Sequence, residues 1–183
     1  MKNLSIFAIV SLLMMGITLT SLWAYAEDQN AYSEPYEAIL AEDNGLLLIP
    51  AYKTEEKSLY FFMKNKHNLG AVYAHEGFFG WKSGMLTWGP ITPDRKFDRL
   101  EGIKGHGENL IYGLINKGEE RIVKVDDENA TILYLSSLSP EVVKEYDLEG
   151  VSLWYFEKDP ESTYNQVQLV EKEGDEVIQS IDL

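Results

Sequence analysis

The sequence predicts a mainly β (α+β) domain, an antiparallel β-sandwich or half-open barrel of about eight or nine short strands with one helix at its start. The first observation behind this prediction is a series of short apolar runs, separated by turn-forming residues, from Gly45 to the C-terminus. The second is the helical spacing of Tyr36, Ile39 and Leu40 just before those runs. Because the sequence contains neither a fixed-period repeat nor a low-complexity tract, we expect a single domain over residues 34–183.

The first 26 residues have the layout of a secretory signal peptide. Lys2 supplies a positive charge, an apolar run extends from Leu4 to Leu22, and Ala24-Tyr25-Ala26 is a small-x-small cleavage site followed by acidic Glu27-Asp28. We therefore expect cleavage after Ala26 and a secreted, extracytoplasmic domain that begins with a polar leader at 27–33. The alternative is an uncleaved single-pass membrane anchor, since a 23-residue helix over 4–26 is roughly 34 Å long.

Charge and cysteine content exclude several classes of protein. The 183 residues include 16 Lys and Arg against 30 Asp and Glu, a net charge of −14. Loss of 1–26 would remove only Lys2 among the charged side chains, so the mature domain has 15 basic and 30 acidic residues and a charge of −15. Such an acidic chain is not a general nucleic-acid binder. The absence of cysteine excludes disulfides, thiolate metal sites, cysteine nucleophiles and a lipidated cysteine.

The expected helix lies at about 34–43, with Ser33 as N-cap, Pro35 in its first turn and Asn44-Gly45 as its stop signal. A second, shorter helical segment of one or two turns is possible from Ser139-Pro140. The longest loop is expected at 89–107, and Gly80 and Gly84 suggest bends in the preceding aromatic segment. The expected strands are 46–49, 58–63, 69–75, 110–115, 122–125, 131–135 and 151–158, with a final hairpin from 167 to 181 around Glu173-Gly174-Asp175.

Motifs for familiar catalytic chemistries are missing. The three histidines are far apart in the sequence, and none belongs to a His-Glu-x-x-His pair. Asp126–Asn129 carries oxygen ligands without the alternation and glycine of a calcium loop. Gly-x-Ser-x-Gly and Ser-x-x-Lys do not occur, and Gly105-His106-Gly107 lacks the third glycine of a dinucleotide-binding loop. We therefore assign no catalytic residue, no metal site and no cofactor.

Aromatic side chains are the most visible enrichment, with 7 Phe, 4 Trp and 11 Tyr. Rings follow one another directly at 78–81 and 154–156, where alternate side chains of a strand point to opposite faces. Most of these rings are expected to fill the core, with one or two partly exposed. We take Trp81 and Trp88 as candidate ligand or partner contacts.

The remaining candidates lie in the expected long loop and beside it. Arg95 and Arg99, with Lys96 and Lys104, form a basic group that is diluted by three acids. A solvated loop with local ion pairs is the simple interpretation, and contact with an anionic envelope polymer or a membrane surface is the alternative.

One histidine and two carboxylates complete the set of candidates. His106 and Glu108 place an imidazole and a carboxylate in a glycine-rich segment, most simply as solvated loop residues. Glu76 and Glu108 are the pair to examine for a carboxylate-based glycan hydrolase, although surface charge is the ordinary role of such acids.

Several strand motifs carry a family resemblance. They are Phe-Phe-Gly-Trp-Lys at 78–82, Ile-Tyr-Gly-Leu-Ile at 111–115, Glu-Arg-Ile-Val-Lys-Val at 120–125 and Leu-Trp-Tyr at 153–155. With these motifs the chain resembles a group of small, functionally uncharacterised exported proteins and lipoproteins of Bacillus-type bacteria. The resemblance implies an extracytoplasmic location and an antiparallel β-rich fold, and it transfers no catalytic residue. Lipoprotein members carry a lipidated cysteine, which this chain lacks.

Together these observations predict an exported, non-enzymatic binding module of the cell envelope, with an envelope protein or a polysaccharide as its partner. Two alternatives stay open. One is a carboxylate-based envelope glycan hydrolase, and the other is a membrane-anchored sensor or regulator ectodomain, which requires residues 4–26 to be retained. Membrane contact is expected only in that anchored form.

Overall fold

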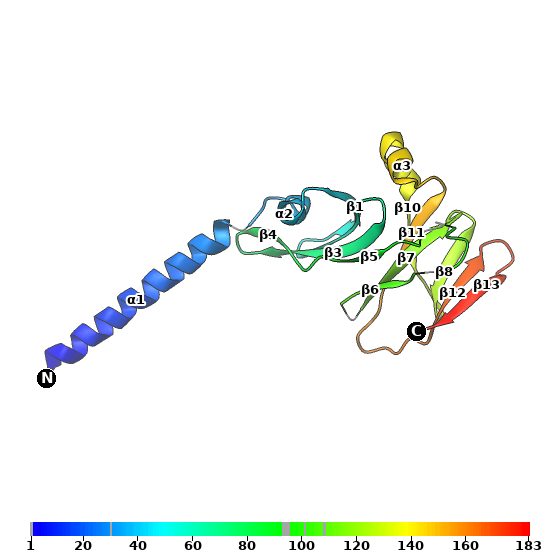
Figure 1. Cartoon of the computed structure of the whole chain (residues 1–183). Coiled ribbons are helices and arrows are strands. Elements are labelled where there is room, and N and C mark those ends of the chain that lie inside the picture. Colours follow the sequence, from blue (N-terminus) through cyan, green and yellow to red (C-terminus); the bar gives the residue numbers. More distant parts are fainter. Residues whose placement is uncertain (1, 30, 93–95, 101, 108) are drawn as a thin grey trace.

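The computed structural model describes residues 2–29, 31–92, 96–100, 102–107 and 109–183. Within these residues the chain forms three helices, α1 (Lys2–Gln29), α2 (Pro35–Glu42) and α3 (Pro140–Tyr146), and a 3₁₀ turn, η1 (Leu135–Ser137) (Figure 1). The strands are β1 (Leu46–Lys53), β2 (Lys57–Lys64), β3 (Asn68–Gly77), β4 (Gly80–Ser83), β5 (Thr87–Pro90), β6 (Lys104–His106), β7 (Leu110–Asn116), β8 (Arg121–Val125), β9 (Glu128–Asn129), β10 (Thr131–Tyr134), β11 (Val151–Glu157), β12 (Gln166–Glu171) and β13 (Val177–Asp182).

The strands form three antiparallel sheets, which confirms the predicted mainly β, antiparallel class. Sheet A has the order β1-β2-β3-β4, with β5 also paired to β3. Sheet B has the order β10-β11-β7-β6, and sheet C has the order β13-β12-β8-β9. The described residues contain thirteen strands rather than eight or nine, because β4, β5, β6 and β9 are short pairings inside segments expected to be bends or loops.

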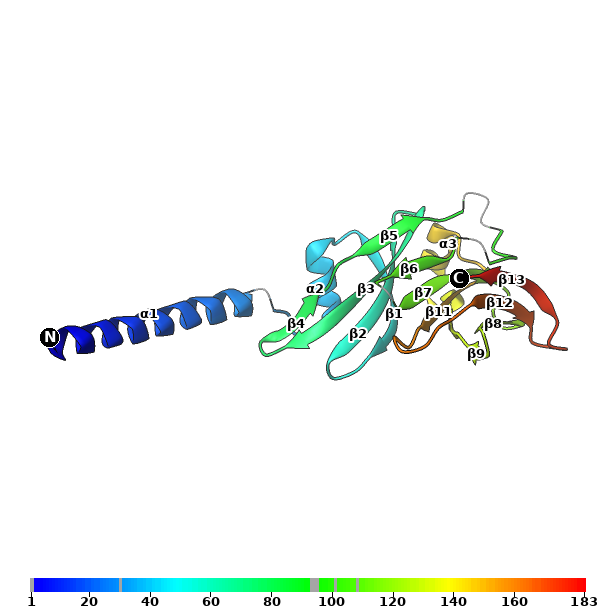
Figure 2. The same ribbon diagram turned by 90° about the horizontal axis from the view of Figure 1, so that it is seen from below.

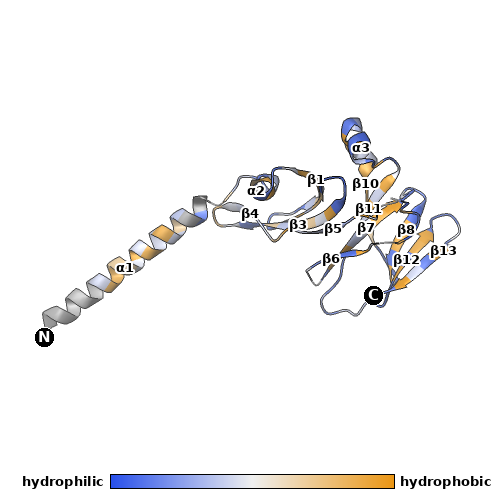
Figure 3. Cartoon of the chain, in the orientation of Figure 1, coloured by the Kyte–Doolittle hydropathy of each residue, from blue (hydrophilic) through white to orange (hydrophobic). Residues whose placement is uncertain are grey.

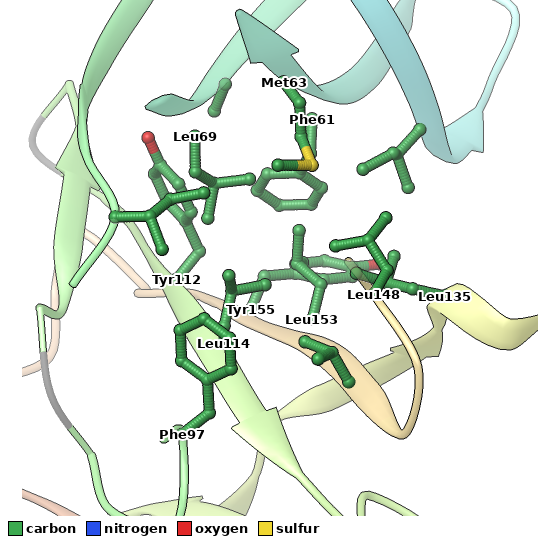
Figure 4. Packing of buried hydrophobic residues seen from close by; sticks show 14 of the residues in the cluster. Phe61, Met63, Leu69, Phe97, Tyr112, Leu114, Leu135, Leu148, Leu153 and Tyr155 are labelled. Atoms are coloured by element: carbon green, nitrogen blue, oxygen red, sulfur yellow. The ribbon is translucent and has the colours of Figure 1, made fainter. Parts of the chain in front are cut away.

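Sheet B is the middle layer of the domain, and its first face packs on sheet A. Alternate residues of β2, including Phe61, meet alternate residues of β7 and β11 (Figure 4). The Phe61 ring lies 5.1 Å from the Tyr112 ring and 5.3 Å from the Tyr155 ring, measured between centroids. These tilted aromatic contacts anchor the core between the two sheets.

The second face of sheet B packs on sheet C. Trp154 and Phe156 of β11 point to this side, where they meet Val123 of β8 and Val167 and Leu169 of β12. Both faces of β11 are therefore covered, so Trp154, Tyr155 and Phe156 are all buried. A strand with two buried faces reads as a continuous apolar run instead of an alternating one.

Helix α2 covers the outer face of sheet A (Figure 2). Ile39 is fully buried there, against a cluster that includes Tyr60 and Phe62. The predicted helix is confirmed, but its N-cap is Glu34 rather than Ser33, because the Glu34 backbone N–H donates to the Glu37 side chain at 3.2 Å. At the other end, the Gly45 N–H donates to Asp43 Oδ1 at 3.0 Å and turns the chain into β1.

Helix α1 extends away from the sheets (Figure 1), and hydrophobic residues recur along the part of it that is coloured in Figure 3. The polar leader expected at 27–33 is divided, since 27–29 belong to α1 and Tyr32 pairs with Trp81 of β4. None of the helices in the described part of the chain combines the length and the apolar character needed to cross a membrane.

Candidate binding surface

The turn between β3 and β4 carries the most exposed aromatic ring of the described residues. Gly77 pairs with Gly80, and the two residues between them are Phe78 and Phe79, which we call the aromatic tip. Phe78 is 94% exposed, and its ring meets that of Phe79 edge to face at 5.1 Å. Gly80 has φ of +131°, a conformation that side chains disfavour, so the glycine permits this tight connection.

The C-terminal end of α1 lies against the aromatic tip. The Trp23 ring meets the Phe79 ring in a T-shaped contact at 6.4 Å, and Lys82 of β4 forms an ion pair with Glu27. Trp23 and Tyr25 are otherwise exposed. Three aromatic side chains thus gather where α1 meets the domain: Trp23, Phe78 and Phe79.

Trp81 does not belong to this surface, and its prediction as a partner contact is corrected. The Trp81 backbone exchanges two hydrogen bonds with Tyr32, at 3.0 and 2.8 Å, so the N-terminal segment continues the sheet edge. Its side chain is 4% exposed in the cluster beneath α2, and Lys53 Nζ covers the ring at 5.2 Å from the centroid. The alternation of β4 directs this ring inward, while the preceding turn leaves Phe78 outside.

Trp88 of β5 is half exposed on the outer face of sheet A. Lys64 Nζ lies 4.3 Å from its ring centroid and forms a 3.0 Å ion pair with Asp43, and the Phe62 ring meets Trp88 edge to face. One face of the indole is therefore occupied by a cation that is itself paired. The Lys64 hydrogen bond is the main reason that the pKa of the Asp43 carboxyl is lowered.

A second group of functional side chains, the polar seam, joins sheets A and B. Its members are Tyr52, Lys57 and Tyr73 from β1, β2 and β3, and Glu157 at the end of β11. The register of sheet A sets Tyr52 and Tyr73 on either side of Leu59 and places Lys57 two residues away on the same face. All three donate to Glu157 Oε1, at 3.0 Å from Tyr52, 2.6 Å from Tyr73 and 3.0 Å from Lys57.

The electrostatics of the polar seam hold Glu157 ionised. Burial acts to raise the pKa of Glu157, but the hydrogen bonds from Tyr73, Lys57 and Tyr52 outweigh it and lower the pKa. Burial, aided by the bond to Glu157, raises the pKa of Tyr73, so its hydroxyl stays a donor. For Lys57, the partners Tyr52 and Glu157 overcome the effect of burial and raise the pKa.

His106 of β6 lies beside the polar seam and faces inward. Its ring is 5.4 Å from that of Tyr73, and its Nδ1 is 2.5 Å from the Thr87 hydroxyl of β5. Burial lowers the pKa of His106, which favours a neutral ring at pH 7. These contacts give His106 a bridging role between β5 and β6, in place of the solvated loop position that the sequence suggested.

Of the predicted basic group, the structure describes Lys96, Arg99 and Lys104. Lys104 turns into the protein and donates to the Pro90 carbonyl at 2.6 Å, and burial lowers its pKa. Arg99 is exposed. Arg95 and Glu108 lie outside the described residues, so the Glu76–Glu108 pair and the contribution of Arg95 are not placed by the structure.

The carboxyl groups with a shifted pKa can be compared with what the alternative glycan hydrolase would need. A glycosidase needs a carboxylic acid whose pKa is raised, whereas the shifted carboxyl groups of Asp43 and Glu157 are both lowered. Beside Lys104, a cavity of about 10 Å³ lined by Leu69, Phe97 and Leu114 has room for about one water. Among the described residues, no group of three or more His, Asp or Glu side chains is placed to hold a metal ion.

The sequence did not single out Glu157 or Phe78. Glu157 is visible in the sequence only as the polar end of the apolar run 151–156, and its three donors are about 84 to 105 residues away along the chain. The exposure of Phe78 could have been predicted, because a side chain in a hairpin turn between two glycines does not lie on a buried face of a strand. Comparison with protein-family models, curated proteins and solved structures finds no match for this chain.

Proposed function

We propose that this protein is an exported, non-enzymatic binding module of the cell envelope that contacts its partner through the aromatic tip. The observation that carries the proposal is the 94% exposure of Phe78, held on a short hairpin with the Phe79 ring beside it. An exposed large apolar side chain costs free energy in water, and covering it on binding returns that free energy. The export part of the proposal rests on the signal-peptide layout of residues 1–26.

A retention experiment tests the binding function. The full-length chain, immobilised through its C-terminus in mild detergent, is incubated with envelope extract and compared with the double variant Phe78→Ser/Phe79→Ser. The matched control is Val177→Ser, which removes a half-exposed apolar side chain from β13. We expect the wild type and the control to retain the same envelope component and the double variant to lose it. Equal retention by all three chains would contradict the proposed surface.

A second candidate is the membrane-anchored form of the same module, in which residues 1–26 are retained. One contact of α1 favours it, because Trp23, which cleavage would remove, packs on Phe79. Intact-mass measurement of the protein from its native envelope distinguishes the two forms. A species that begins at Glu27 would exclude the anchored form, and a species that begins at Met1 would exclude cleavage.

A further inference from the structure

We infer that, while α1 is attached, the aromatic tip contacts the surface of a lipid bilayer, with the Phe78 and Phe79 rings at the level of the headgroups. This inference rests on the proposed function, because it names the partner class of the same surface. It predicts membrane contact by the β-domain itself, in addition to any contact made by α1.

The first argument is the position of α1 next to the tip. The described side chains from 11 to 25 expose large apolar groups around the helix, and a helix that is apolar all round requires apolar surroundings. A lipid bilayer supplies such surroundings. The exposed members are Leu12, Leu13, Met14, Met15, Ile17, Leu19, Leu22, Trp23 and Tyr25.

The second argument is the contact that couples the two elements. Trp23 meets Phe79 ring to ring, and the Glu27–Lys82 ion pair lies on the adjoining strand. Whatever medium surrounds the end of α1 must therefore border the tip. Trp and Tyr rings near the end of an apolar helix are typical of the membrane–water interface, and Trp23 and Tyr25 occupy this position.

The third argument concerns shape and chemistry. The two Phe rings lie on a protruding turn, and Phe carries no hydrogen-bonding group to orient a sugar or a peptide. Of the charged residues next to the turn in sequence, Lys82 is paired with Glu27, and Glu76 is an exposed carboxylate two residues before Phe78. Residues 27–183 carry a net charge of −15, so a zwitterionic bilayer surface suits the domain better than an anionic one.

The absence of cysteine permits a direct test. A single cysteine is introduced into the full-length chain as Phe78→Cys, labelled with an environment-sensitive fluorophore, and the chain is reconstituted with phosphatidylcholine vesicles. Phe79→Cys is the second reporter and leaves Phe78 intact. The matched control is Glu173→Cys, an exposed position in the β12–β13 turn at the end of the molecule remote from α1 (Figure 1).

We expect the emission of both tip labels to shift to shorter wavelength and to be quenched by nitroxide-labelled lipid. The label at 173 should keep the emission wavelength that it has without vesicles. If the chain binds vesicles while both tip labels remain in a water-like environment, the inference is wrong. Retention of an envelope protein or polysaccharide through Phe78 and Phe79 would then leave the proposed function standing with a different partner. If the tip labels stay in a water-like environment and no envelope component is retained through Phe78 and Phe79, both proposals are wrong.

Discussion

Glu157 receives hydrogen bonds on one oxygen from three strands of another sheet. Its side chain is one-third exposed, so solvent screens part of this interaction. The cluster nevertheless fixes the relative position of β11 and sheet A, because all three donors converge on the same atom. The role of this carboxylate is to hold the two sheets together.

The variant Glu157→Gln tests this role through pH. The lowered pKa of Glu157 means that its stabilising effect is present above the ordinary glutamate pKa of 4.5 and is lost as pH falls through the folded-state value. We expect the variant to have a lower Tm than the wild type at pH 7, and the two melting temperatures to converge below pH 4.5. Circular dichroism melts across this range measure the effect, with Glu173→Gln as the exposed control. A difference that is independent of pH would contradict the assignment.

At Gly113 the Trp154 ring lies so close to the backbone that there is no room for a side chain. It lies opposite Trp154 in the β7–β11 pairing, and a Cβ at this position would be 2.9 Å from Trp154 Nε1. We expect Gly113→Ala to lower the free energy of unfolding by about 1–3 kcal/mol through overpacking. Urea denaturation measures this change. Gly105→Ala on β6, whose Cβ would meet its nearest neighbour at an ordinary 3.7 Å, is the control and should have a smaller effect.

At the scale of elements, α2 is a short helix that depends on its buried side. Ile39 is fully buried against sheet A, whereas Tyr36 on the same helix is 44% exposed. An eight-residue helix has little stability of its own, so packing must hold it. The same packing covers Trp81, which explains why the ring chosen from the sequence is inaccessible.

We expect Ile39→Ala to lower the free energy of unfolding by about 2–5 kcal/mol, because it removes a fully buried side chain and leaves a cavity. Tyr36→Ala, on the exposed side, should change it by much less. Urea denaturation monitored by tryptophan fluorescence gives both values. Equal effects of the two substitutions would show that α2 is not held by its buried face.

The elements also show what local sequence patterns could predict. The helix at 34–43 was found from its apolar spacing and its Pro and Gly signals, and the hairpin of β12 and β13 was found from Glu173-Gly174-Asp175. The short strands β5 and β6 were missed, since neither has an alternating apolar pattern: β5 is held by pairing with β3, and β6 by pairing with β7. For that reason the sequence did not predict that His106 of β6 contacts Thr87 of β5.

At the scale of the whole molecule, sheet B unites the domain. It buries one face on sheet A and the other on sheet C, so sheet B is the layer that both other sheets pack against. The three buried clusters of the described residues contain no side chain of α1. We therefore expect the sheets to stay folded without that helix.

A chain that begins at Glu27 tests this expectation. We expect residues 27–183 to unfold cooperatively, with a Tm close to that of the full-length protein. Thermal unfolding followed by circular dichroism measures the transition, and two-dimensional NMR checks that the shorter chain is folded. A broad transition or poorly dispersed NMR signals would contradict a self-sufficient core.

The sequence by itself determined the mainly β antiparallel class, the position of α2, the final hairpin and the absence of cysteine chemistry. These features follow from periodicity, turn residues and composition, all of which act locally. Only the tertiary structure decided that Trp81 is covered, that Phe78 is exposed, and that Glu157 meets Tyr52, Tyr73 and Lys57. The physical reason is that burial and hydrogen bonding depend on which sheet faces which, and strand register places residues side by side that are far apart in the chain.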